Sequence, residues 1–109
     1  MSHQGIDPVI HPPKRLAAMA LLAHAQSADF RFVRDHLRVS DSDLSKQMAE
    51  LAKAGYVEIR KQGRGPGAST TYRITRAGRR AYADYRAAIS ALLADPAQPV
   101  PDADVPRHR

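Results

Sequence analysis

The spacing of apolar residues along the chain is mostly helical, and one stretch alternates like paired strands. The most informative segment is 41–54, where three apolar residues at i, i+4 and i+7 share one helical face: Leu44, Met48 and Leu51. Ser40, followed three residues later by Asp43, resembles a capping box at the start of this helix. Gly55 can supply the left-handed residue that ends it. We therefore predict a helix over 41–54.

Three further helices follow from the same spacing. Residues 14–25, behind Pro12 and Pro13, are apolar nearly all round, so this helix should be covered on more than one side, which suggests a partner chain. Ser27 or Asp29 can cap a short second helix that carries Phe30, Val33 and Leu37. A last helix, capped by Thr75, should run to about residue 94. Its apolar stripe consists of Tyr82, Tyr85, Ala88, Ile89 and Leu92.

Strand signals occur only after the 41–54 helix. Residues 57–60 and 71–74 alternate apolar and polar side chains, which predicts two short strands. Between them, residues 63–67 contain three glycines and a proline around Arg64, so we expect a mobile hairpin tip that carries a cation. The fold class is mainly α with a small β-hairpin (α+β). The tight connection over 37–40 suits a helix-turn-helix corner, so we interpret the domain as a winged helix-turn-helix.

Length and composition fit one domain over 11–94, with an N-terminal arm over 1–10 and a disordered tail over 95–109 that is rich in proline and acid. Within the arm, Ile6, Val9 and Ile10 could pack on the domain. There is no cysteine, no apolar run of membrane length and no signal-peptide pattern. We therefore expect a soluble cytoplasmic protein, associated with the nucleoid, and no partnership with a membrane.

The net charge of +6 is concentrated in one part of the chain. Between Arg60 and Arg86 stand eight Arg or Lys residues and a single acid, Asp84. A block of one sign repels itself unless a polyanion lies beside it, and this charge together with the 41–54 helix and the hairpin favours double-stranded DNA as the partner. The plainer alternative is a solvated basic face.

Four segments resemble winged helix DNA-binding domains related to the MarR and ArsR transcriptional regulators, and they occur in that family's order. They are residues 10–16, which open the first helix, 40–45 and 50–57, which flank the 41–54 helix, and 70–79, which leave the hairpin. The resemblance implies a homodimeric bacterial or archaeal regulator that dimerises through its first and last helices. The chain departs from the family in its more glycine-rich wing tip and in Gln47, where the family often has histidine.

The candidate site residues form three groups. On the recognition helix, side chains that can contact base edges or phosphates are Ser42, Ser45, Lys46, Gln47 and Lys53. On the wing, cations suited to phosphate or minor-groove contact are Arg60, Lys61, Arg64 and Arg73. At the dimer interface we expect Leu16, Met19, Ala20, Tyr82, Tyr85, Ile89 and Leu92. We expect Arg79 and Arg80 to be structural or dimer-facing.

Other functions have weaker support. Five histidines are present, but none stands at i, i+4 to another, so we expect no metal, and His11 is interpreted as local structure. No glycine-rich loop joins a strand to a helix and no nucleophile or carboxylate constellation is visible, so we expect neither an enzyme nor a cofactor. The favoured function is a homodimeric regulator, most simply a repressor, on a near-palindromic operator. A winged helix used as a protein-interaction module and a regulator with a small-molecule effector remain alternatives.

Overall fold

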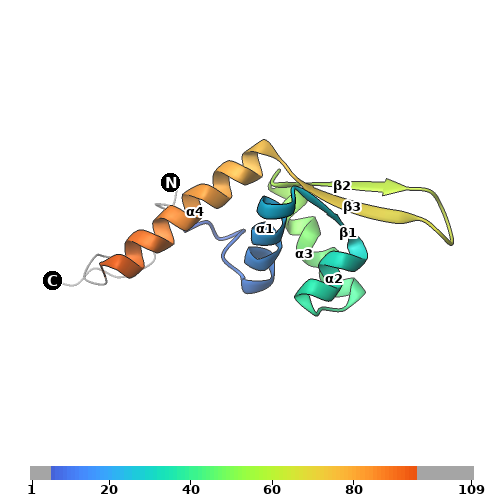
Figure 1. Cartoon of the computed structure of the whole chain (residues 1–109), viewed down its shortest axis with the longest axis horizontal. Coiled ribbons are helices and arrows are strands. Elements are labelled where there is room, and N and C mark those ends of the chain that lie inside the picture. Colours follow the sequence, from blue (N-terminus) through green and yellow to red (C-terminus); the bar gives the residue numbers. More distant parts are fainter. Residues whose placement is uncertain (1–5, 96–109) are drawn as a thin grey trace.

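The computed structural model describes residues 6–95. Four helices and a three-stranded antiparallel sheet make up this part of the chain (Figure 1). Their bounds are α1 (Pro13–Ala25), β1 (Ser27–Asp29), α2 (Phe30–Leu37), α3 (Asp41–Lys53), β2 (Val57–Gln62), β3 (Ser69–Ile74) and α4 (Arg76–Ala94). The predicted α+β winged helix fold is confirmed. The disordered tail predicted from residue 95 lies outside the described residues, apart from Asp95 itself.

The sheet has one strand more than the sequence predicts. β3 lies in the centre, with β2 on one side and β1 on the other, and Tyr72 pairs with both Ala28 and Ile59. β1 was missed because three residues are too few to show an alternating pattern. It pairs with β3 because Gln26 ends α1 with a positive φ (72°) and its carbonyl oxygen accepts a hydrogen bond from the Ile74 amide (3.1 Å). The wing strands are also two residues longer than predicted.

Capping side chains set where three of the helices begin. The Asp29 carboxylate accepts from the Phe32 amide (2.8 Å), which selects Asp29 over Ser27 as the cap of α2. Ser40 Oγ accepts from the Asp43 amide (3.1 Å), and Thr75 Oγ1 accepts from the Gly78 amide (2.9 Å). Gly55 (φ 85°) ends α3 as predicted, and the Tyr56 amide then bonds back to Leu51 O (3.0 Å).

The core lies where α1, α3 and the sheet meet. All three apolar residues of the predicted α3 face have no exposed surface, and Met19, Leu22 and Val33 are equally buried. Ile10 also has none, so the packed domain begins before the predicted boundary at residue 11. Asp7 contributes to this packing, because its carboxylate accepts hydrogen bonds from the Val9 amide (2.8 Å) and from Tyr56 Oη (2.5 Å).

The wing and α4 extend from the core in opposite directions (Figure 1), which makes the molecule long and narrow, at 61 × 24 × 23 Å. At its start, α4 crosses the base of the wing at very short range. A Cβ added to Gly78 would fall on the Tyr56 carbonyl group and lie 3.1 Å from Ile74 Cγ1. Only glycine therefore allows this close approach. No helix within residues 6–95 is long and apolar enough to cross a membrane.

Candidate nucleic-acid interface

The outer face of α3 is small, polar and free of bulky side chains. Ser42, Ser45, Lys46, Ala49 and Lys53 are all exposed, and they lie opposite the buried apolar face of the same helix. This is the amphipathic arrangement that the sequence predicts. A helix with such a face can approach the floor of a major groove, because hydroxyl and ammonium groups reach base edges without steric obstruction.

An ionic contact fixes the corner between α2 and α3. Arg38 adopts a left-handed conformation (φ 58°) at the end of α2, and the chain then enters α3 after two residues. From α2, Arg34 Nη1 donates to Asp41 Oδ1 (3.0 Å) at the first residue of α3. Hydrogen bonds to Asp41 and then to Asp35 raise the pKa of Arg34. The contact ties α2 to the start of the recognition helix.

Gln47 differs from its exposed neighbours on α3, because it is only partly exposed and both ends of its amide are bonded within the protein. Its Nε2 donates to Asp43 Oδ1 (3.0 Å), and its Oε1 accepts from Arg15 Nη1 (2.9 Å). Asp43 also accepts from Lys14 Nζ (2.5 Å). The hydrogen bond from Gln47, with a second from Lys14, lowers the pKa of Asp43. These two bonds hold the Gln47 amide against Arg15 of α1 and Asp43 of α3.

The four predicted wing cations are exposed, but they do not share one face of the hairpin. Arg73 pairs directly with Glu58, and side chains of paired residues point to the same face, so Arg60, two residues after Glu58, also lies on that face. Lys61 lies on the other face. Arg60 Nε is 3.4 Å from Glu58 Oε1, so one acid partly neutralises this side. Arg64 occupies the tip, between Gly63 (φ 80°) and Gly65 (φ 62°).

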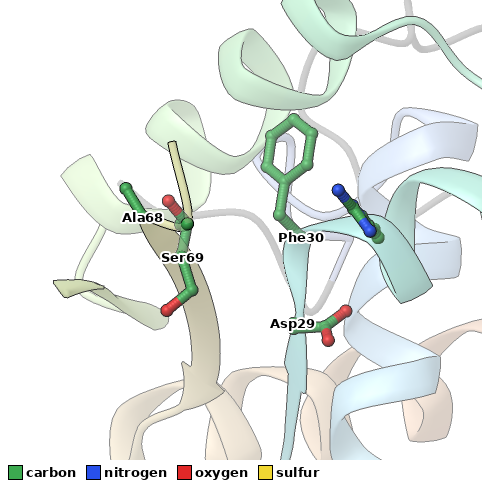
Figure 2. A pocket seen from close by; sticks show the side chains of 7 residues that line it. Asp29, Phe30, Ala68 and Ser69 are labelled. Carbon is green, nitrogen blue, oxygen red and sulfur yellow. The ribbon is translucent and has the colours of Figure 1, made fainter. Parts of the chain in front are cut away.

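A cavity of about 420 Å³ separates the start of α2 from the end of the wing. Figure 2 shows Asp29 and Phe30 on one side of it and Ala68 and Ser69 on the other. Arg31 also lines the cavity and is the only cation among the lining residues. No sequence pattern predicts this cavity, because it depends on β1 pairing beside the wing. One arginine and a capping carboxylate do not form a constellation for catalysis.

The structure divides the predicted dimer residues into two sets. Met19 has no exposed surface and Tyr85 has 5%, so both belong to the core of a single protomer. Tyr85 Oη is 2.8 Å from His11 Nδ1, which explains His11 as local structure at the start of α1. The other predicted residues keep part of their surface exposed: Leu16, Ala20, Tyr82, Ile89 and Leu92. Leu93, which we did not select, is 73% exposed.

A second cavity, of about 460 Å³, lies between α1 and α4. Small side chains form its walls, and one aromatic and three basic residues line it: Tyr82, His24, Arg79 and Arg86. Arg79 Nη1 donates to Ala23 O (3.3 Å) at the end of α1, so Arg79 has the structural position we expected. The Arg86 guanidinium lies 6.0 Å from the centre of the Tyr82 ring. Within residues 6–95, no three His, Asp or Glu side chains gather as metal ligands.

These features define a class: a winged helix protein of the DNA-binding regulator type, with a recognition helix and a basic wing. The sequence model described as "winged helix DNA-binding domain" matches residues 14–93, and the chain belongs to that family. The predicted resemblance is therefore confirmed. Transcriptional regulators of this family are not enzymes, and neither is this chain.

Solved structures agree with this assignment. A transcriptional regulator homologue from Pyrococcus horikoshii OT3 superposes with a TM-score of 0.75 at 20% identity, over 83% of this chain and 89% of that one. A protein described as a possible transcriptional regulator for arsenical resistance gives 0.60 at 26% identity, over 88% and 90%. NadR in complex with 4-hydroxyphenylacetate gives 0.60 at 20% identity, over 79% and 68%. A comparison with curated protein sequences finds no match.

Proposed function

We propose that the protein is a transcriptional regulator that binds a specific double-stranded DNA site as a homodimer, most simply as a repressor. The observation that carries the proposal is the exposed face of α3, where Ser42, Ser45 and Lys46 stand clear of the protein beside a basic wing. Hydroxyl and ammonium groups can bond base edges in the major groove. Arg64 at the wing tip, with Arg60 and Arg73 behind it, supplies the phosphate or minor-groove contacts.

The dimer is proposed from the second half of α4. This part of the helix extends beyond the core (Figure 1) and presents Ile89, Leu92 and Leu93, the last of which is 73% exposed. An apolar stripe on a projecting helix favours pairing with a second copy about a two-fold axis, together with the exposed parts of α1. Two recognition helices would then enter successive major grooves about 34 Å apart, on a near-palindromic operator.

The test is fluorescence anisotropy of a labelled duplex taken from the DNA that flanks the protein's own gene, at two salt concentrations. We expect tight binding that weakens steeply with salt and that an unrelated duplex cannot compete away, because several phosphates are neutralised. Equal binding of both duplexes would leave a non-specific role. No binding at low salt would favour the alternative, a winged helix that binds another protein. Sedimentation velocity of the free protein tests the dimer separately.

The cavity between α1 and α4 favours a regulator that responds to an effector. Basic groups of His24, Arg79 and Arg86 beside the Tyr82 ring suit a small anion with an apolar part. NadR, whose fold is similar, is known in complex with 4-hydroxyphenylacetate. Thermal shift with a panel of small aromatic carboxylates tests this second proposal, and a positive compound should also change DNA affinity. A panel without any thermal shift would remove the support for an effector of this kind.

A further inference from the structure

The recognition helix is braced by a chain of polar contacts from the N-terminal turn and α1. Arg15, on α1, reaches in two directions: its Nε donates to Val9 O (2.7 Å) and its Nη1 to Gln47 Oε1 (2.9 Å). Gln47 in turn donates a hydrogen bond to Asp43, whose carboxylate also accepts one from Lys14 (2.5 Å). The side chains Lys14, Arg15, Asp43 and Gln47 form what we call the α1–α3 network.

A further hydrogen bond connects the turn before α1 to the segment that follows α3. Val9 lies in the turn that Asp7 holds, and Asp7 accepts a hydrogen bond from Tyr56 Oη, three residues after the last residue of α3. The middle of the recognition helix, through Arg15 and Gln47, and the segment after its end, through Tyr56, are therefore tied to the same turn before α1. Ile10, at the end of that turn, is fully buried, which anchors the brace in the core.

The Gln47 amide is held by two hydrogen bonds within the protein. One bond comes from a guanidinium and the other goes to a carboxylate, and hydrogen bonds to charged groups are the stronger kind. Its side chain is partly buried, whereas Ser42, Ser45 and Lys46 are exposed. Lys14 is 52% exposed, and its ammonium group pairs with the Asp43 carboxylate.

From this geometry we propose that Gln47 is a positioning residue and not a base-reading residue. Arg15 acts through it to set the orientation of α3, and base reading is left to Ser42, Ser45 and Lys46. The proposal rests on the proposed function, since it specifies how that function's recognition helix is held. Two neighbouring residues of α3 therefore have different roles. Lys46 is exposed and is left to read bases, whereas Gln47 bonds to Arg15 of α1 and positions the helix.

The experiment compares Gln47→Leu, Arg15→Met and the double variant with the wild type. The probe is a duplex that the wild-type protein enriches from a random-sequence pool. Each single variant should bind this duplex about tenfold more weakly, and the double variant no more weakly than the worse single variant, because either change breaks the same connection. The order of base preference and the salt slope should stay as in the wild type, since neither residue touches a base or a phosphate.

Two results would overturn the inference. A changed preference at one base pair in Gln47→Leu would show that Gln47 reads a base. A salt slope reduced by about 0.9 in Arg15→Met would show that Arg15 contacts a phosphate. Lys46→Ala is the matched control on the same helix, and its effect should add to that of Arg15→Met because the two residues share no partner.

Thermal melting verifies that each variant is folded at the assay temperature. If Arg15→Met is unfolded there, Arg15→Lys replaces it, because lysine keeps the charge and can reach only one of the two acceptors. Its base preference and slope should again match the wild type. Failure of the wild-type protein to enrich any sequence is a different result, since it would refute the proposed function itself.

Discussion

Replacing Gly78 with alanine tests how closely α4 must approach the base of the wing. In an exposed helix this change is favourable by about 1 kcal/mol, because glycine has the greater conformational freedom when unfolded. Here the new Cβ would fall on the Tyr56 carbonyl group and lie 3.1 Å from Ile74 Cγ1. That carbonyl also accepts the hydrogen bond from the Thr75 amide (3.0 Å), so it cannot move without loss.

The two opposing effects give the expected magnitude. Overpacking costs about 1–3 kcal/mol, and weakening a backbone hydrogen bond costs about 1 kcal/mol. After subtracting the propensity gain of about 1 kcal/mol, we expect a net loss of roughly 2 kcal/mol. For a domain of this size, that corresponds to a fall in Tm of roughly 8–16 °C.

The assay is thermal unfolding followed by circular dichroism at one fixed protein concentration. Asp84→Ala is the control, because Asp84 is an exposed residue of α4 and its replacement should change only helix propensity, by less than about 1 kcal/mol in the stabilising direction. A Gly78→Ala protein that melts at or above the wild-type temperature would refute the reasoning, since it would mean that α4 can move away from the wing without loss of stability.

Three further predictions concern DNA contact, dimerisation and pH. Lys46→Ala combined with Arg64→Ala should weaken binding to the flanking duplex and leave Tm unchanged, because both side chains are exposed; unchanged affinity would remove these two site residues. In sedimentation velocity, Leu93→Glu should raise the dimer Kd at least about tenfold, because each leucine loses about 1.5–3 kcal/mol of burial free energy. The control is Ala87→Glu, on the opposite side of α4, which should leave the sedimentation coefficient unchanged. Burial, with the Asp7 hydrogen bond second, raises the pKa of Tyr56 from 10.0 to about 12. The protonated Tyr56 hydroxyl therefore contributes fully to the free energy of unfolding below pH 10, and this contribution is lost as pH rises to about 12. In urea titrations, the free energy of unfolding of Tyr56→Phe should fall less over that range than that of the wild type. An equal fall in both proteins would contradict the raised pKa of Tyr56.

Local signals predicted the recognition helix well. Its apolar spacing, the Ser40 cap and the Gly55 stop are all properties of neighbouring residues, and the structure has each of them in place. β1 could not be predicted in this way. Three residues carry no pattern, and the strand exists because the end of α1 places them beside β3.

The parts of the site that escaped prediction depend on distant residues. Gln47 looked like any other polar residue of α3, and its partner Arg15 lies 32 positions away in the sequence. Met19 and Tyr85 show a related difficulty at the predicted dimer surface. α1 is apolar nearly all round, so the pattern cannot distinguish the side covered by its own chain from a side left for a partner.

The projecting α4 would act as a lever arm if it tilted at Gly78, where it packs against the base of the wing. From Gly78 to Ala94 the helix is about 24 Å long, so a tilt of about 10° at Gly78 moves its far end by roughly 4 Å. If two chains are joined through that far end, the same tilt shifts the separation of their recognition helices by more than the rise of one base pair, about 3.4 Å. The close packing of Gly78 against the Tyr56 carbonyl, by limiting this tilt, would then set the half-site spacing of the operators that the dimer binds.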